Sequence, residues 1–203
     1  MQVCPVFHGT SIEGRLDCPG ARDVLNLGEM SAGLTINRAE TRTSQHLKVI
    51  SRTFGDGDTI PPEFSDYGRG TSFPLAWSEG PIGTRSYAVL LEDPDAREVD
   101  PFVHWVVWNI PSYATSLRRA VPMQEELDDP EGARQGPTSS GGVGYHGPRP
   151  PAGETAHHYH VQVFAIDRLL DLPPGAGRDE LVTAIGGHVL ASGELVGTFE
   201  HAR

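Results

Sequence analysis

The chain contains 203 residues, and a chain of this length buries roughly 70% of its unfolded surface, so it needs no metal or disulfide to fold. Its 24 glycines and 17 prolines indicate many turns, which favours a β-rich fold and argues against a helical bundle. The 16 Lys and Arg residues against 27 Asp and Glu residues give a net charge of −11, which argues against nonspecific binding to nucleic acid or anionic membranes.

Residues 1–45 differ from the rest of the chain because they show no sustained periodicity and are interrupted by glycines. We predict a loosely structured extension there, followed by one domain over residues 46–203. Both cysteines, Cys4 and Cys18, lie in the extension and form a poor disulfide framework. Because the N-terminus lacks a secretory signal and no stretch approaches about 20 apolar residues, we expect a cytoplasmic protein with no membrane insertion.

Five segments are predicted to be β-strands from their hydrophobic patterns. The third and fourth are nearly continuous apolar runs, which indicates that both of their faces are covered, as in the middle of a sandwich, and the fifth is a further strong strand. The strands are predicted over residues 47–54, 71–77, 86–92, 103–110 and 158–166. Residues 112–156 are predicted to be mostly loop, and a loop of that length inside a domain is usually functional or disordered.

A helix is predicted near the C-terminus, beginning at residues 179–180, whose two negative charges suit a first helical turn. Leu181, Ile185 and Val189 recur every four residues and predict its apolar face. Residues 195–199 are expected to form either a short closing strand or a second helical turn. Together these segments predict a mainly β fold, an antiparallel β-sandwich with one or two C-terminal helices.

Titratable residues gather at three places near the ends of the predicted strands. Asp93 and Asp95 flank a proline directly after one strand, and His104 lies inside the next apolar strand. The third place is the glycine- and proline-rich segment 144–151, which is followed by three histidines and a tyrosine over residues 157–160. A capped turn and a hydrogen-bonded core histidine are the alternative interpretations of the first two places.

These clusters, in this order, resemble the phosphatidylethanolamine-binding proteins, also called Raf kinase inhibitor-like proteins, and in particular their bacterial branch. The resemblance spans about residues 47–200, departs from the family pattern at residues 65–70, and implies an antiparallel, Greek-key-type β-sandwich. It is carried by Asp-Pro-Asp-Ala at 93–96, Phe-Val-His-Trp-Val-Val-Trp-Asn-Ile-Pro at 102–111, Gly-Tyr-x-Gly-Pro-x-Pro-Pro-x-Gly at 144–153, and His-x-Tyr at 157–159.

The resemblance also implies one small pocket that binds an anion, such as the phosphate of a phospholipid head group or a carboxylate. The aspartates are expected to raise the pKa of His104 or His157, so that a charged imidazole donates to the anion beside the Tyr159 hydroxyl. Arg149 stands where the bacterial pattern usually has cysteine; pointing inward it suits two phosphate oxygens, and pointing outward it is a solvated charge. The candidate ligand-binding residues are Asp93, Asp95, His104, Gly147, Arg149, Pro150, Pro151, His157 and Tyr159.

We therefore expect non-catalytic binding of phosphate, phosphoethanolamine or a carboxylate, with no catalytic residue, no metal and no cofactor. The sequence contains neither a Gly-x-Ser-x-Gly nucleophile motif nor a His-Glu-x-x-His zinc motif. Two alternatives remain open. One is an inhibitor of a kinase or protease, in which the pocket modulates a protein partner. The other is an acid/base or metal-dependent hydrolase built on the clustered histidines.

Overall fold

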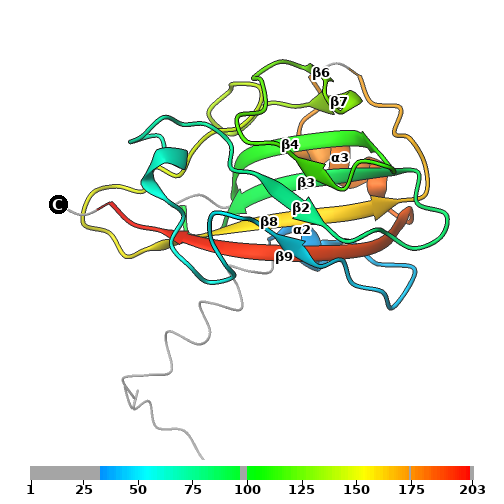
Figure 1. Cartoon of the computed structure of the whole chain (residues 1–203), viewed down its shortest axis with the longest axis horizontal. Helices are drawn as coiled ribbons and strands as arrows, with labels where there is room; N and C mark the ends of the chain where they lie inside the picture. Colours follow the sequence, from blue (N-terminus) through cyan, green and yellow to red (C-terminus); the bar gives the residue numbers. More distant parts are fainter. Residues whose placement is uncertain (1–32, 97–99, 174, 202–203) are drawn as a thin grey trace, which may run out of the picture.

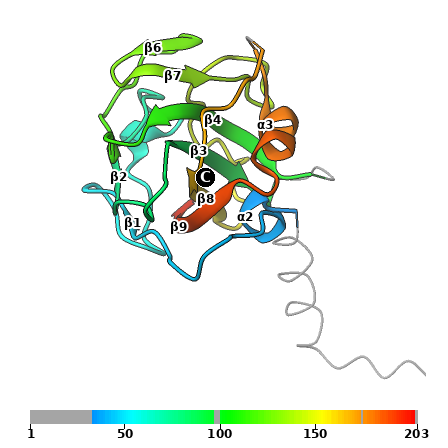
Figure 2. The same ribbon diagram turned by 90° about the vertical axis from the view of Figure 1, so that its right-hand side faces the viewer.

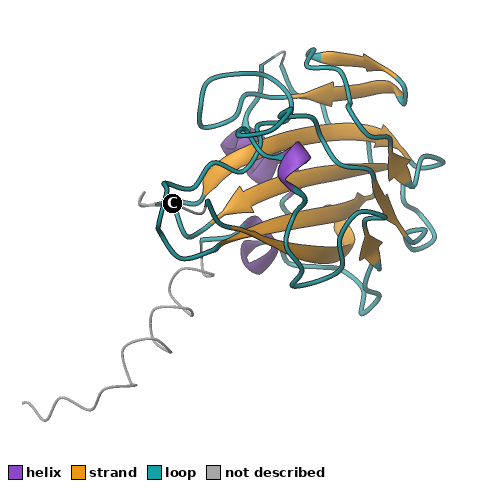
Figure 3. Cartoon of the chain, turned by 60° about the vertical axis from the view of Figure 1, so that its left-hand side comes forward, coloured by secondary structure: helices purple, strands orange, loops and turns teal. Residues whose placement is uncertain are grey.

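The computed structural model describes residues 33–96, 100–173 and 175–201, so that Cys4 and Cys18 lie outside the described residues. In the described part, strands dominate and form two antiparallel sheets, one of order β6-β7-β4-β3-β8-β9 and one of order β1-β2-β5 (Figure 1, Figure 3). The strands are β1 (Val49–Ile50), β2 (Leu75–Trp77), β3 (Ser86–Asp93), β4 (Phe102–Pro111), β5 (Ser116–Leu117), β6 (Glu126–Asp128), β7 (Glu131–Gln135), β8 (His157–Ile166) and β9 (Val189–Phe199). The helices are α2 (Thr35–Arg38), the 3-10 helix η1 (Pro62–Phe64) and α3 (Arg178–Ile185).

The large sheet is covered on both faces, and β3 shows why its sequence is apolar throughout. Every residue of β3 is buried, and successive side chains point to opposite faces. Tyr87, Val89 and Leu91 belong to the core between the sheets, whereas Ala88 and Leu90 belong to a second core with residues of α3. Figure 2 accordingly shows the small sheet on one side of the large sheet and both α2 and α3 on the other.

The mainly β sandwich predicted from the sequence is confirmed, and its three buried strands are β3, β4 and β8. Strand β3 lies between the other two and is antiparallel to both. Asp93 pairs with Phe102 of β4, and Glu92 pairs with His160 of β8. The end of β3 therefore meets the beginnings of β4 and β8, which brings the three polar clusters of the sequence to one end of the sheet.

The predicted C-terminal helix is wrong in its last turn. Helix α3 ends at Ile185, and Val189 is the first residue of β9. Gly187 adopts a φ of +74°, a left-handed conformation that commonly stops a helix. Strand β9 then pairs with β8 along its whole length, so the apolar spacing at Val189 belongs to a strand.

Three further stretches differ from the prediction. The strand expected at 47–54 is only β1, and the strand expected at 71–77 is only β2. The expected loop 112–156 contains β5, β6 and β7. Of these short strands, β1, β5 and β6 lie at sheet edges. Strands β1, β2 and β5 pair with partners distant in sequence, which local propensity does not reveal.

Residues 33–45 of the predicted extension are described, and their helix α2 is bonded to the domain. The backbone N–H and the hydroxyl of Thr35 donate to the carboxylate of Glu92 at 2.8 and 3.0 Å. Arg178, at the start of α3, donates its Nε to the same carboxylate at 2.8 Å. Because Glu92 is fully buried, these donors and the Arg178 charge offset the cost of burying its carboxylate. One buried carboxylate thus joins β3, α2 and α3.

Candidate functional site

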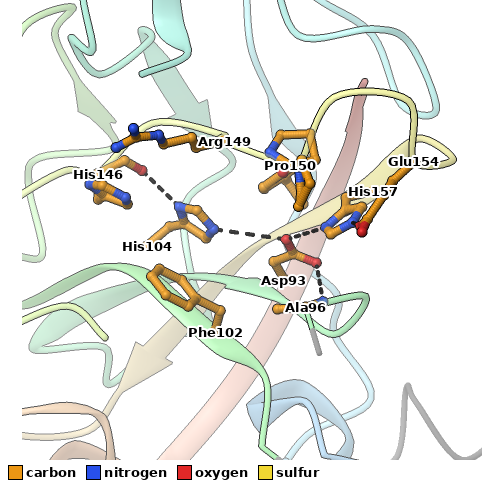
Figure 4. A pocket seen from close by; sticks show the side chains of 11 residues that line it. Asp93, Ala96, Phe102, His104, His146, Arg149, Pro150, Glu154 and His157 are labelled. Atoms are coloured by element: carbon orange, nitrogen blue, oxygen red, sulfur yellow. Dashed lines mark hydrogen bonds and ion pairs between the residues drawn. The ribbon is translucent and has the colours of Figure 1, made fainter. Parts of the chain in front are cut away.

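A cavity of about 310 Å³ opens where β3 ends and β4 and β8 begin, beneath the loop that precedes β8. Figure 4 shows a chain of polar contacts across it, from His146 through His104 and Asp93 to His157. The cavity is lined by Asp93, Ala96, Phe102, His104, His146, Arg149, Pro150, Pro151, Glu154, His157 and Tyr159.

Asp93 is the central carboxylate of the cavity, and a turn fixes its orientation. Its Oδ1 accepts the backbone N–H of Asp95 at 2.8 Å and of Ala96 at 3.2 Å. A proline between the two aspartates sets the backbone for this turn, in which a side chain accepts from amides two and three residues onward. The second oxygen, Oδ2, is thereby held toward His157 and His104.

His157 is the cationic candidate of the site. Its Nδ1 lies 2.8 Å from Asp93 Oδ2, and its Nε2 lies 3.4 Å from Glu154 Oε2. The hydrogen bond to Asp93 raises the pKa of His157 above its ordinary value and outweighs the opposing effect of burial. The ring is therefore disposed to carry a positive charge and to present an N–H at each carboxylate.

His104 differs from His157 because burial lowers its pKa to about 4. Only 3% of the residue is exposed, and the loss of hydration outweighs both its hydrogen bond to His146 and the charge of Asp93. Its Nδ1 lies 2.9 Å from the backbone oxygen of His146, which can only accept, so this nitrogen carries the proton. Of the two histidines for which a raised pKa was expected, His104 is therefore the one that is neutral near pH 7.

Tyr159 contributes a buried hydroxyl on the same side of β8 as His157, because the two residues are two apart in a strand. The hydroxyl forms no hydrogen bond of regular geometry within the described residues. Burial, then the negative charge of Asp93 and a hydrogen bond to it, raises the pKa of Tyr159, so the hydroxyl keeps its proton. A buried phenol beside a cavity favours a polar occupant.

Three other candidate residues have different positions. Arg149 lies at the rim with 65% of its side chain exposed and its Nη1 3.6 Å from Asp66 Oδ2. The Asp95 carboxylate turns away from the cavity and accepts from the backbone N–H and Nδ1 of His158 at 2.6 and 2.7 Å. Gly147 packs so tightly that a Cβ there would lie 2.6 Å from the backbone nitrogen of Asp66. Its role is close packing of the loop.

Comparison with known proteins agrees with this geometry. Residues 50–200 match the sequence model described as "Phosphatidylethanolamine-binding protein". A UPF0098 protein of Pyrococcus horikoshii is 40% identical over 151 residues, which cover 74% of this chain and 75% of that protein. The chain belongs to the phosphatidylethanolamine-binding protein family. A UPF0098 protein of Methanothermobacter thermautotrophicus is 38% identical over 153 residues, which cover 75% of this chain and 98% of that protein.

A solved structure of the phosphatidylethanolamine-binding protein family shows the same fold. Escherichia coli YbcL, described as a new member of the mammalian family, matches with a TM-score of 0.72 and 28% identity. The match covers 77% of this chain and 99% of YbcL. The family resemblance drawn from the motifs is thus confirmed.

In this member of the family, seven of the nine candidate residues line the cavity, all except Asp95 and Gly147. Sequence reasoning missed four lining residues. Ala96 and Phe102 stand inside the family motifs that were recognised, and His146 occupies the variable position of the Gly-Tyr-x-Gly motif. Glu154 follows that motif, and no sequence signal marked it.

The cavity of this family member is lined by carboxylates, imidazoles and a phenol. None of its lining residues is Ser, Thr or Cys, and the phenol of Tyr159 stays protonated. Across residues 33–96, 100–173 and 175–201, no group of three or more His, Cys, Asp or Glu side chains is arranged to hold a metal ion. Over the same residues, no helix is long and apolar enough to cross a membrane.

Proposed function

We propose that this phosphatidylethanolamine-binding protein binds a small anion of the phosphate or carboxylate class in the cavity, without turning it over. The observation that carries the proposal is the pair of donors on one face of β8. His157 is held in a charge-favouring contact with Asp93, and the Tyr159 hydroxyl beside it is buried with no hydrogen bond of regular geometry. A cavity of about 310 Å³ lies at the small end of ligand sites, which suits a head group.

Local charges support capture of an anion by a protein whose net charge is −11. Protonated His157 and the rim guanidinium of Arg149 offset the carboxylates of Asp93 and Glu154 around the cavity. Glu154 faces the same Nε2 of His157 that an anion would contact. An entering anion therefore competes with Glu154 for this N–H, which favours a modest affinity.

Non-catalytic binding is proposed because the cavity lining supplies no activated nucleophile. An Asp–His pair alone could still assist attack by water, so the hydrolase alternative has a direct test. Phosphoethanolamine incubated with the protein should be recovered intact by phosphorus NMR, and release of phosphate above the rate of a His157→Ala variant would refute the proposal. Regulation of a protein partner and a cytoplasmic location remain predictions of the sequence.

Binding should be measured by calorimetry with phosphate, phosphoethanolamine and acetate between about pH 5.5 and pH 8. Because the folded pKa of His157 is raised, the ring is charged in the acidic range and loses its proton as the pH rises through that value. Anion affinity should therefore fall as the pH rises above about 6.5. An affinity that is independent of pH would contradict a charged imidazole at the site.

Replacing His157 gives the matched test of the residue. His157→Ala should weaken binding by about 1.5–3 kcal/mol, the size of a hydrogen bond to a charged group. His188→Ala is the control, since His188 is paired with Asp167 and does not line the cavity. Equal affinity in the wild type and His157→Ala would remove His157 from the site.

A further inference from the structure

One wall of the cavity is a loop that rests on two other segments of the chain. We call residues 148–153 the wall loop, and three of its residues, Arg149, Pro150 and Pro151, line the cavity (Figure 4). The segments that contact it are residues 65–70, where the sequence departs from the family pattern, and the chain that follows β9. The wall loop lies outside the helices and strands, so its position depends on these contacts.

Prolines limit the hydrogen bonds that can hold the wall loop. Residues 148, 150 and 151 are prolines, which have no backbone N–H to donate. The loop must therefore be held largely through its carbonyl oxygens. At its two ends, the oxygen of Pro148 accepts the N–H of Asp66 at 3.0 Å, and the N–H of Gly153 donates to the oxygen of His201 at 3.0 Å.

Tyr67 holds the middle of the wall loop. Its hydroxyl donates to the backbone oxygen of Pro150 at 2.7 Å. Its ring stacks on the imidazole of His201, with 3.7 Å between the ring centroids, and lies nearly parallel to Phe199 at 6.5 Å. The residue is 43% exposed, yet it is fixed both at its ring and at its hydroxyl. The stacked ring thus directs the hydroxyl toward the loop.

We propose that Tyr67, supported by the ring of His201, is a positioning residue that holds the wall loop over the cavity and slows the release of a bound anion. Tyr67 does not line the cavity, so it acts through the position of Pro150 and its neighbours. This inference rests on the proposed function, because it concerns how the same site retains its ligand.

A fixed wall favours retention of the anion for two physical reasons. It keeps water away from the hydrogen bonds between the anion and the cavity, and those bonds are stronger where water is excluded. A loop that is ordered before binding also avoids the entropy cost of ordering it when the anion enters. One neutral hydrogen bond corresponds to about a twofold to tenfold change in an equilibrium constant, and this range sets the expected effect.

Tyr67→Phe removes the hydroxyl and keeps the ring. Tyr113→Phe is the matched control, because Tyr113 is 77% exposed and does not line the cavity. Phosphate should bind to Tyr67→Phe about twofold to tenfold more weakly in calorimetry, and its dissociation rate from phosphorus NMR line shapes should rise by a similar factor. Tyr113→Phe should match the wild type in both measurements.

Amide hydrogen exchange tests the position of the loop without any ligand. The Gly153 amide should exchange about twofold to tenfold faster in Tyr67→Phe, because release of Pro150 favours opening of the loop and of the bond to His201. The Leu170 amide, which donates to the side chain of Asn109 in another loop, should keep its rate.

His201→Ala tests the support of Tyr67, because it removes the stacked ring and leaves the backbone oxygen that Gly153 contacts. It should also accelerate exchange at Gly153. Combined with Tyr67→Phe, its effect should be smaller than the product of the two single effects, since both act through one contact. A double variant whose effect equals that product would overturn the support by His201.

The binding measurements separate this inference from the proposed function. Phosphate binding in the wild type, with the same affinity and dissociation rate in Tyr67→Phe, would overturn the role of Tyr67 and leave the proposed anion site standing. Faster exchange at Gly153 without a change in phosphate binding would overturn it in the same way. Absence of phosphate binding in the wild type would overturn the proposed function, together with the inference that rests on it.

Discussion

Lowering the pH from about 6.5 to about 4 is expected to destabilise the protein through one buried group, His104. Its folded pKa is lowered from 6.5 to about 4, so the unfolded chain binds more protons over this interval and stability falls as the pH falls. The difference between these values corresponds to about 3 kcal/mol of unfolding free energy. Above the unfolded value, this contribution is fully present.

The assay is urea denaturation at a series of pH values, followed by tryptophan fluorescence, because all three tryptophans are buried. His104→Asn keeps a side-chain amide that can donate to the His146 backbone oxygen but does not titrate. The stability advantage of the wild type over His104→Asn should shrink by about 3 kcal/mol between pH 7 and pH 4.

Leu127→Ala is the control for this experiment, because it removes a buried side chain and no titrating group. Its stability should lie below that of the wild type by an amount that does not change with pH. A wild-type advantage over His104→Asn that stays constant across the same pH range would refute the conclusion that His104 is buried and neutral.

Three further substitutions test the framework of the site. Gly147→Ala should lower the unfolding free energy by about 1–3 kcal/mol, because its Cβ would meet backbone at 2.6 Å, whereas Gly142→Ala, with nothing within 4 Å, should be close to neutral in denaturation. Glu92→Ala should cost about 3–5 kcal/mol in the same assay, because it leaves a nearly buried guanidinium without its partner. Glu154→Gln should tighten phosphate binding about twofold to fivefold at pH 6, because it removes the carboxylate that competes for His157 Nε2; weaker binding in calorimetry would mean that Glu154 helps to hold the anion.

Much of the architecture was predictable because a strand that is buried on both faces has a nearly continuous run of apolar residues. The runs that became β3, β4 and β8 were recognised, together with the polar residues at their ends. The fold class and the family followed from these segments. Antiparallel pairing of consecutive strands then brings the end of one beside the beginning of the next, which places Asp93 near His104 without further information.

Short edge strands and helix ends were less predictable because their energies are shared with distant partners. The four-residue spacing through Val189 suits a helix locally, but in β9 every residue except Leu190 is paired with β8. Glu154 reached the cavity only because the loop before β8 folds back over His157. No local sequence pattern predicts that this loop folds back over the cavity.

The sequence by itself indicated that Asp93, His104 and His157 meet at the end of the sheet, and the tertiary structure decided what each of them does. A motif places His104 and His157 near the same carboxylate, and both appear equally suited to carry a charge. In the fold, His157 contacts Asp93 at 2.8 Å, whereas His104 donates its Nδ1–H to a backbone oxygen and loses its hydration. A pKa depends on distance, hydrogen bonding and burial, and those quantities exist only once the chain has folded.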